Sequence, residues 1–405
     1  MSPLPFGYRI AVWVVKLTIL AAQLHLFVWL QQALVARYPR MGRRLAFAAA
    51  MLAAGLVGSS ELFDRERGLL GLGSLPDPLR YSATIWVAGC FGAYLMLGLH
   101  RAWRAIRNRI PGTSPLSSRP ADALPASGIT RRRMIETAAQ TALAAPFAVA
   151  GYGTFIGRTQ FTVREVDIKV KNLAPGLEGL RLAQLTDLHF GLNLSPGELE
   201  TVVALTNEVR PHLTLVTGDL ITQEGDPLDK CIDILSDLRA DSGVWACMGN
   251  HEAYAGSAAH CESYARDAGI RFLRQQSELL RFGGAKLNLC GVDYQSQRKP
   301  YLPQAGALVR DDAFNLLLSH NPDVFPAAAD LGYDFVVSGH THGGQVTVEI
   351  LEQWVNPAHF FTPFVAGEYR LDRSALYVSR GIGTINLAMR IGALPEISLL
   401  TLRRA

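Results

Sequence analysis

The chain has 405 residues, which at roughly 100–200 residues per domain predicts two or three domains. Hydrophobic residues make up 49% and charged residues 18% of it, and the mean hydropathy is +0.15, so the composition excludes a disordered chain and favours one that lies partly in lipid. The formal net charge is only +4. Because no basic stripe with interleaved aromatic residues is present, we do not expect nucleic-acid binding. The five cysteines form no Cys-x-x-Cys pair, which argues against a disulfide framework or a thiolate zinc site and predicts buried thiols.

Three apolar stretches lie in the first hundred residues, and each approaches the roughly 20 residues that a helix needs to cross a bilayer. They are residues 10–36, 45–62 and 81–99. We therefore predict three transmembrane helices within residues 1–109. The first contains Lys16 and His25, which are costly in lipid, and we favour a structural explanation for both because Lys16 is close enough to an end to reach the interface.

A fourth, Ala-rich stretch spans residues 138–156 and contains Pro146. It follows Thr130-Arg131-Arg132-Arg133-Met134-Ile135, which resembles a twin-arginine export signal in its hydroxyl residue, its arginines and its weakly hydrophobic continuation. We favour a signal over residues 134–157. The alternatives are an uncleaved fourth transmembrane helix and a surface or soluble helix.

The distribution of basic residues predicts how the chain is oriented. Residues 37–44 are strongly basic, residues 61–80 are close to neutral, and residues 101–133 hold eight arginines against one acid, Asp122. By the positive-inside rule the first and third of these segments face the cytoplasm. Residues 110–133 then form a Pro/Ser/Arg-rich cytoplasmic linker, and a crossing after it places the rest of the chain on the extracytoplasmic face of a bacterial cytoplasmic membrane.

From residue 158 to 405 short β-rich runs alternate with amphipathic helical segments, a pattern typical of an α/β domain. The predicted strands are residues 180–185, 213–216, 244–248, 287–290, 314–318 and 335–337. The predicted helices are residues 196–209 with Ser195 as N-cap, 227–238 behind Asp226, and 257–268.

Residues that bind metals follow five of these strands at their carboxyl ends. The segments are Thr186-Asp187-Leu188-His189, Thr217-Gly218-Asp219, Gly249-Asn250-His251-Glu252, Ser319-His320-Asn321 and Ser338-Gly339-His340-Thr341-His342-Gly343-Gly344. In open α/β sheets such ends converge on one crevice. Asp, His and one amide oxygen suit Mn, Fe or Zn. Because seven candidate ligands exceed the need of one ion, we predict two divalent metal ions bridged by Asp219, an arrangement that clamps phosphate oxygens.

The order D-x-H, GD, GNHE, H and GHTHGGQ resembles the calcineurin-like metallophosphoesterase superfamily, over about residues 181–345 with a family-like tail at 378–383 and 395–397. The extended GHTHGGQ segment and the export-type signal resemble the bacterial membrane-associated branch represented by YkuE and YaeI. The resemblance implies a four-layer αββα sandwich, here preceded by an α-helical transmembrane region. It says nothing about residues 1–130.

The resemblance also implies roles for individual residues. One metal ion would be held by Asp187, His189, Asp219 and His342. The other would be held by Asp219, Asn250, His320 and His340. His251 would be a catalytic residue that is not a ligand and that stabilises the transition state or protonates the leaving oxygen. Two further expectations come from the residues themselves. Gly339, Gly343 and Gly344 permit tight turns beside the ions. Arg380 is a candidate for binding a substrate phosphate, with an ordinary surface arginine as the equal alternative. No role is assigned to His212, His260 and His359.

The sequence therefore predicts a membrane-anchored phosphoesterase with two metal ions, acting on phosphodiester, phosphomonoester or pyrophosphate bonds of envelope or lipid-linked substrates. Its expected partners are such a substrate and membrane lipid. An alternative is a cytoplasm-facing pyrophosphatase of the UDP-diacylglucosamine type. Another is a non-catalytic membrane sensor with a phosphoesterase-like binding domain, and a transporter built on the first helices is weaker still because those spans are nearly free of polar residues. The oligomeric state, the metal and the natural substrate are not readable from the sequence.

Overall fold

The computed structural model describes residues 6–37, 42, 44, 77–109, 131–191, 193–296, 301–350 and 353–405. Its contacts divide the chain into two compact units, residues 1–154 and 155–405. The predicted span at residues 45–62 lies outside the described residues, and so do residues 110–130 of the predicted linker.

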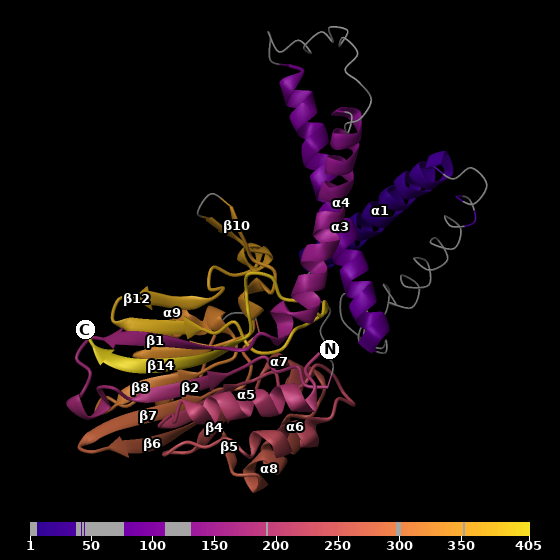
Figure 1. The fold of residues 1–405 in the computed structure, drawn as a ribbon. Helices are drawn as coiled ribbons and strands as arrows, with labels where there is room; N and C mark the ends of the chain where they lie inside the picture. The colour runs from indigo at the N-terminus through magenta and orange to yellow at the C-terminus, as the bar shows by residue number, and fades with distance from the viewer. Residues whose placement is uncertain are drawn as a thin grey trace. The chain divides into compact units, whose positions relative to one another are not determined.

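The described residues of the first unit form three long helices: α1 (Phe6–Arg37), α3 (Asp77–Arg107) and α4 (Arg131–Phe155) (Figure 1). The predicted apolar stretches at residues 10–36 and 81–99 lie within α1 and α3. Among the described residues, α3 is the one helix that is long and apolar enough to cross a membrane, while α1 contains a shorter apolar segment, Leu17–Val28. The three-span region is thus not confirmed.

Polar groups of α1 are paired with α3. The Trp86 indole donates to the Gln23 side chain at 3.2 Å, and the Arg101 guanidinium lies 3.1 Å from the His25 imidazole. Because arginine can only donate, His25 accepts this bond. The contact supports the structural explanation for His25.

The second unit holds two six-stranded sheets. The first has the order β1 (Thr162–Val170), β14 (Glu396–Arg404), β2 (Arg181–Leu185), β3 (Leu213–Thr217), β4 (Val244–Cys247) and β5 (Ile270–Phe272). The second has the order β12 (Gly367–Leu371), β13 (Ser374–Val378), β9 (Phe335–Ser338), β8 (Phe314–Leu318), β7 (Ala285–Gly291) and β6 (Gln276–Phe282). Strands β2 to β5 are parallel to one another, and so are β7, β8, β9 and β13. A small antiparallel hairpin, β10 (Val348–Ile350) with β11 (Gln353–Val355), follows β9.

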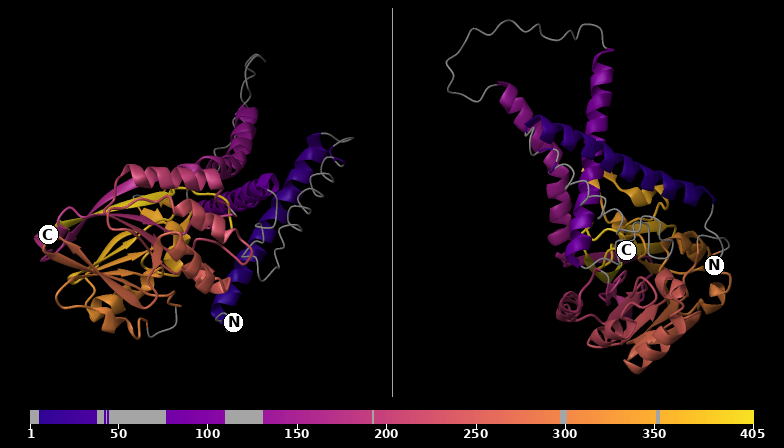
Figure 2. Two further views of the ribbon diagram at one scale, coloured as in Figure 1. Left: turned by 90° about the horizontal axis from the view of Figure 1, so that it is seen from below. Right: turned by 90° about the vertical axis from the view of Figure 1, so that its right-hand side faces the viewer.

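Side chains that alternate along the strands pack one face of each sheet against the other sheet and the opposite face against outer helices. In β3, Leu213 and Leu215 belong to the core between the sheets, whereas Val216 packs with α5 (Pro196–Glu208), α6 (Leu228–Leu235) and α8 (Ala258–Asp267). The other sheet is covered on its outer face by η4 (Ala305–Leu308), η5 (Pro322–Val324) and α9 (Phe325–Leu331), so helices lie on opposite sides of the strands (Figure 2). The predicted α/β sandwich of four layers is confirmed for this unit.

The helices begin where local chemistry favours it, with one exception. Ser195 caps α5 in a reciprocal box with Glu198, and Pro196 occupies the first turn, as predicted. Asp226, expected ahead of α6, does not cap that helix. Its carboxylate accepts bonds from the backbone N–H of Thr222 and Gln223, at 2.8 and 3.0 Å, and so closes the preceding loop instead. All five cysteines are buried and free, as predicted.

Candidate metal centre

The candidate ligands stand on loops that leave both sheets at the carboxyl ends of parallel strands. Asp187 and His189 follow β2, Asp219 follows β3, and Asn250 begins the short helix α7 (Asn250–Tyr254) after β4. From the second sheet, His320 follows β8, while His340 and His342 follow β9, the latter on the one-turn helix η6 (His342–Gly344). Two sheets packed face to face bring these loops to one edge of the sandwich, as the sequence predicted for such strand ends.

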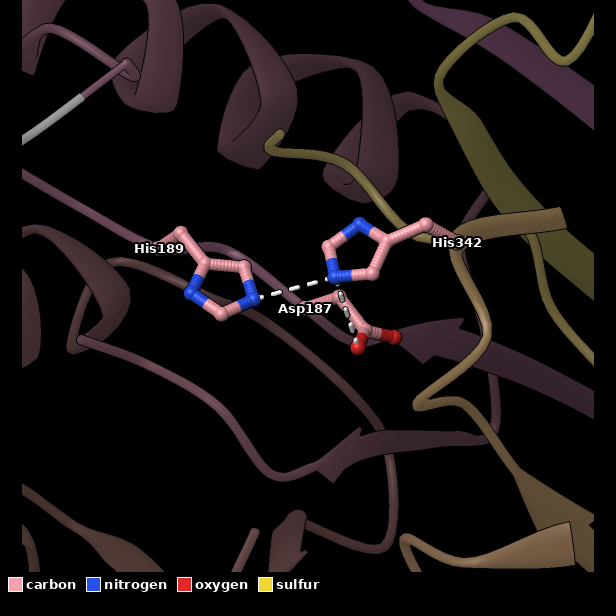
Figure 3. A group of neighbouring side chains, drawn as sticks. All are labelled: Asp187, His189 and His342. Carbon is pink, nitrogen blue, oxygen red and sulfur yellow. Dashed lines mark hydrogen bonds and ion pairs between the residues drawn. The ribbon is translucent and has the colours of Figure 1, made fainter. Parts of the chain in front are cut away.

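Asp187, His189 and His342 form one buried cluster (Figure 3). The Nε2 atoms of the two histidines are 3.1 Å apart, and Nε2 of His342 lies 3.4 Å from a carboxylate oxygen of Asp187. The two imidazoles point toward each other, with the carboxylate beside them. These donor atoms lie close enough together to share one cation.

A second cluster contains Asp219, His320 and His340. Nε2 of His320 lies 3.0 Å from Oδ2 of Asp219 and 3.2 Å from Nδ1 of His340. The same Asp219 oxygen is 3.8 Å from Nε2 of His189, which belongs to the first cluster. Asp219 therefore stands between the two groups, where a bridging ligand must be.

The fit of the pocket to a cation can be tested on Asn250. Its side chain is 5% exposed, and its carboxamide oxygen accepts no hydrogen bond. A buried carbonyl oxygen without a partner carries a free-energy cost of about 1–3 kcal/mol. Coordination to a cation would satisfy this oxygen, so the donor set of Asp, His and one amide oxygen fits a metal centre.

His251 lies beside both clusters. Its Nδ1 is 2.5 Å from the carbonyl oxygen of Thr222, and since a carbonyl only accepts, Nδ1 carries the proton and Nε2 is left free. Its backbone N–H donates to Asp219 at 2.9 Å. Because His189, Asp219 and His251 also lie within reach of one cation, geometry leaves both a catalytic and a ligand role open for His251.

Comparisons with known proteins agree with this geometry. Residues 180–344 match the calcineurin-like phosphoesterase family. This part of the chain belongs to that family. The phosphoesterase YkuE of Bacillus subtilis is 28% identical over 256 residues, covering 62% of this chain and 89% of YkuE, and is called an uncharacterized metallophosphoesterase. Phosphodiesterase YaeI of Escherichia coli is 28% identical over 280 residues, covering 68% of this chain and 99% of YaeI.

A third relative extends beyond this domain. The transmembrane protein with metallophosphoesterase domain of Danio rerio is 28% identical over 331 residues, which cover 78% of this chain and 72% of that protein. Together these relatives place the chain in the YkuE/YaeI-type branch, and its second unit is a metal-dependent phosphoesterase domain. The resemblance drawn from the motifs is confirmed.

Burial sets the charge state of three histidines in the phosphoesterase site. It lowers the pKa of His189 and of His340 to about 3, and the pKa of His342 well below its usual range. These three imidazoles are therefore neutral at neutral pH, which is the form that binds metals.

Asp219 and His320 behave as an ion pair. Burial disfavours the charge on both, but their mutual attraction and hydrogen bond outweigh it, so the pKa of Asp219 lies well below its usual range and the pKa of His320 above it. The Nδ1 of His320 donates to the carbonyl oxygen of Thr217 at 2.7 Å, which aims Nε2 at Asp219.

The backbone around the site is strained. Five candidate ligands that are not glycine have the left-handed conformation: Asp187, His189, Asp219, His340 and His342, with φ between 47° and 74°. This conformation costs about 1–2 kcal/mol per residue. Such strain is typical of functional sites, where the surrounding structure enforces it.

Glycines allow the ligand loops to approach one another. Gly343 and Gly344 have φ of 57° and 71°, as the predicted tight turns require. Gly339 acts differently, because a Cβ on it would collide with the Thr186 hydroxyl and the Asp187 carboxylate. Its role is close packing of the loops after β9 and β2.

Two buried charged residues that the sequence did not single out hold these loops. The Glu252 carboxylate accepts bonds from the backbone N–H groups of Gly249, Asp219 and Leu220 at 2.7–3.0 Å, and so ties the loop after β3 to the loop after β4. The fully buried Arg390 donates to the carbonyl oxygens of Gly383, Ala393 and His342. The GNHE motif contains Glu252, but its bond pattern is visible only in three dimensions.

Two tyrosines, also not predicted, stand beside the histidines. The Tyr294 ring lies 5.7 Å from the His340 ring and 6.2 Å from the His320 ring, and 6.3 Å from the ring of Tyr254. Tyr254 in turn lies 5.9 Å from His251 and is 59% exposed. The pair forms an aromatic side of the site that is partly open to solvent.

The other residues considered from the sequence lie as follows. Arg380 packs along the η6 turn, next to Gly343, and its guanidinium is 3.8 Å from the Glu396 carboxylate. His212 accepts a bond from the backbone of Arg181, and His260 pairs with Asp229. Within the part of the chain that the structure describes, neither of these histidines nor His359 belongs to the metal-binding clusters.

The central position of Asp219 gives the first testable prediction. Asp219→Asn replaces the shared carboxylate by a nearly isosteric amide, so we expect it to lose most bound metal and turnover while keeping the fold. Elemental analysis, activity with added Mn²⁺ and circular dichroism would measure the three properties. Wild-type metal content and activity in purified Asp219→Asn would contradict the two-metal arrangement.

A second prediction concerns Glu252. Glu252→Gln replaces one of the two accepting carboxylate oxygens by an NH₂ group, which cannot accept a hydrogen bond. At least one buried backbone N–H then loses its acceptor, so the free energy of unfolding should fall by about 1–3 kcal/mol. Urea denaturation would measure it, with Glu200→Gln on the exposed side of α5 as the matched control. Equal stability of the two variants would show that the Glu252 bonds are not structural.

Proposed function

We propose that this protein is a membrane-anchored phosphoesterase that uses two divalent cations to hydrolyse phosphate esters or pyrophosphates of envelope or lipid-linked substrates. The observation that carries the proposal is the pair of buried His and Asp clusters joined by Asp219, with the unpaired oxygen of Asn250. One cation would be held by Asp187, His189, Asp219 and His342. The other would be held by Asp219, Asn250, His320 and His340.

Two bound cations, of Mn, Fe or Zn, would supply Lewis-acid stabilisation of the phosphate oxygens during in-line displacement. The side chains of the protein supply the ligands and the proton donor. Neutral His189, His340 and His342 would bind without first losing a proton, whereas His320, which is protonated in its pair with Asp219, would lose its Nε2 proton on binding. His251, fixed by its Nδ1–H bond to Thr222, has Nε2 left to take up a proton, and the imidazolium so formed would give that proton to the leaving oxygen and return to the neutral form.

The substrate class follows from the proposed membrane location. The outward side chains of α1 and α3 include large apolar residues that are 47–71% exposed, among them Leu17, Leu24, Leu95 and Leu99. Such a surface suits lipid better than water. The Danio rerio relative, named as a transmembrane protein, supports the same location. A phosphoesterase held at a membrane meets phosphate esters of lipids and envelope polymers first.

Purified full-length protein with added Mn²⁺ tests the activity directly. We expect hydrolysis of bis(p-nitrophenyl) phosphate, and the comparison with a mononucleotide and a glycerophosphodiester separates diesterase from monoesterase activity. Loss of turnover with a chelator and recovery with Mn²⁺ would support the metal requirement. No hydrolysis of any of the three by metal-loaded protein would favour a binding role.

A third prediction separates proton donation from metal binding. His251→Ala should retain two metal ions per chain and lose about 10²–10⁴-fold in kcat, because that is the typical contribution of general acid catalysis. His260→Ala, which removes an exposed histidine outside the clusters, is the matched control. If elemental analysis finds one ion missing from His251→Ala, the residue is a ligand.

The fourth prediction concerns orientation. Eight arginines in residues 101–133 should hold that segment in the cytoplasm, so the domain that follows residue 157 lies on the other side. A reporter active only outside the cytoplasm should give signal when fused after Ala405 and none when inserted in residues 110–130. Replacing Arg131 and Arg132 by lysine should reduce the first signal if a twin-arginine signal is used, and change it little if residues 138–156 insert as an ordinary helix. A reporter that is silent after Ala405 would place the domain in the cytoplasm.

A further inference from the structure

Two adjacent phenylalanines are exposed on the segment that follows β11. Phe360 is 88% exposed and Phe361 is 60% exposed, at the end of the short helix η7 (Pro357–Phe360) that follows β11. Phenylalanine buries a large apolar surface in most folds. Two neighbouring exposed rings therefore mark a surface that binds something apolar.

The segment that carries these rings is fixed to the metal-ligand turn at both ends. Before the rings, the Asn356 side chain donates to the carbonyl oxygen of Gly343 at 2.6 Å and to the Thr347 hydroxyl at 2.8 Å. After them, the Thr341 hydroxyl donates to the carbonyl oxygen of Val365 at 2.5 Å. Thr341 and Gly343 are the two neighbours of His342. The exposed rings thus lie on a segment whose two ends are bonded to the neighbours of a candidate ligand.

The chemistry of this segment favours a lipid surface as its occupant. From residue 356 to 366 the sequence is Asn-Pro-Ala-His-Phe-Phe-Thr-Pro-Phe-Val-Ala, with no acidic residue to be repelled by lipid phosphates. The chain also contains α3, which is apolar and long enough to cross a membrane. Aromatic side chains in loops and helices of peripheral proteins enter the boundary between headgroups and acyl chains.

We propose that Phe360 and Phe361 insert into the bilayer that anchors this chain, and so present the metal centre to phosphate groups of lipids within that bilayer. This proposal rests on the proposed function, because it assumes a phosphoesterase held at a membrane. It narrows the substrate class to phosphate esters that reside in the bilayer. Soluble esters would reach the same centre without help from the rings.

Insertion can be measured without any turnover. The five native cysteines are buried, so Phe361→Cys in the full-length protein offers one accessible thiol for an environment-sensitive fluorophore. In nanodiscs we expect emission from this label to be quenched by spin-labelled acyl chains. The matched control is Glu200→Cys on the exposed face of α5, where quenching should be absent.

Two outcomes of the labelling experiment would overturn the proposal. One is equal emission from the two labels with and without spin-labelled lipid. The other is a signal from the label at position 361 that depends on protein concentration and not on lipid, since that would indicate a second copy of the chain as the occupant.

Enzyme kinetics give a second test of the proposal. The double variant Phe360→Ser/Phe361→Ser should raise KM about tenfold for a fluorescent phospholipid embedded in nanodiscs and leave kcat/KM for bis(p-nitrophenyl) phosphate within about twofold. Leu371→Ser on β12 is the matched exposed apolar control and should change neither. Equal effects on both substrates would overturn the proposal. Quenching of the label at position 361 in a protein that hydrolyses neither substrate would support insertion while contradicting the proposed function, so the two failures are distinguishable.

Discussion

The carboxylate of Asp219 is the group on which the architecture of the site depends. It pairs with His320, approaches His189 in the other cluster, and accepts the backbone N–H of His251. A buried charge is stable only when it is paired and hydrogen-bonded, so the loops around Asp219 must supply partners from both sheets at once. This requirement joins two layers of the sandwich that otherwise touch mainly through apolar side chains.

The same requirement explains the unusual backbone of the ligand loops. Strands that end at one edge bring their following residues close together, but side chains on an ordinary backbone would point away from a common centre. Asp187, Asp219 and His340 have the left-handed conformation, and their side chains lie in the two clusters. The loops are held in place by Glu252, which accepts from the backbone N–H of Asp219, and by Arg390, which donates to the carbonyl oxygens of Gly383 and His342. Stability and the geometry of the site are therefore coupled.

Sequence reasoning predicted the parts of this design that are local. Buried parallel strands are continuous apolar runs, and β2, β3, β4, β7, β8 and β9 were recognised for that reason. Candidate ligands were found because they follow those runs directly. Edge strands such as β12, and residues that act through distant bonds such as Arg390, have no comparable local pattern. Asp226 precedes α6 as predicted, but its carboxylate accepts bonds from Thr222 and Gln223 and closes the preceding turn, which the sequence does not reveal. The role of Tyr294 depends on contacts with residues that are far from it along the chain.

The order of strands in the first sheet has a consequence for how the protein is made. Among the described residues, strand β1 pairs with β14 alone, and β14 also pairs with β2, so the strand that lies between them is supplied by residues 396–404. During synthesis β1 and β2 leave the ribosome more than 200 residues before their shared neighbour, and both carry an unsatisfied edge until it arrives. The first sheet is complete only after translation has passed β14, so these edges stay unpaired in the nascent chain while most of the domain is synthesised.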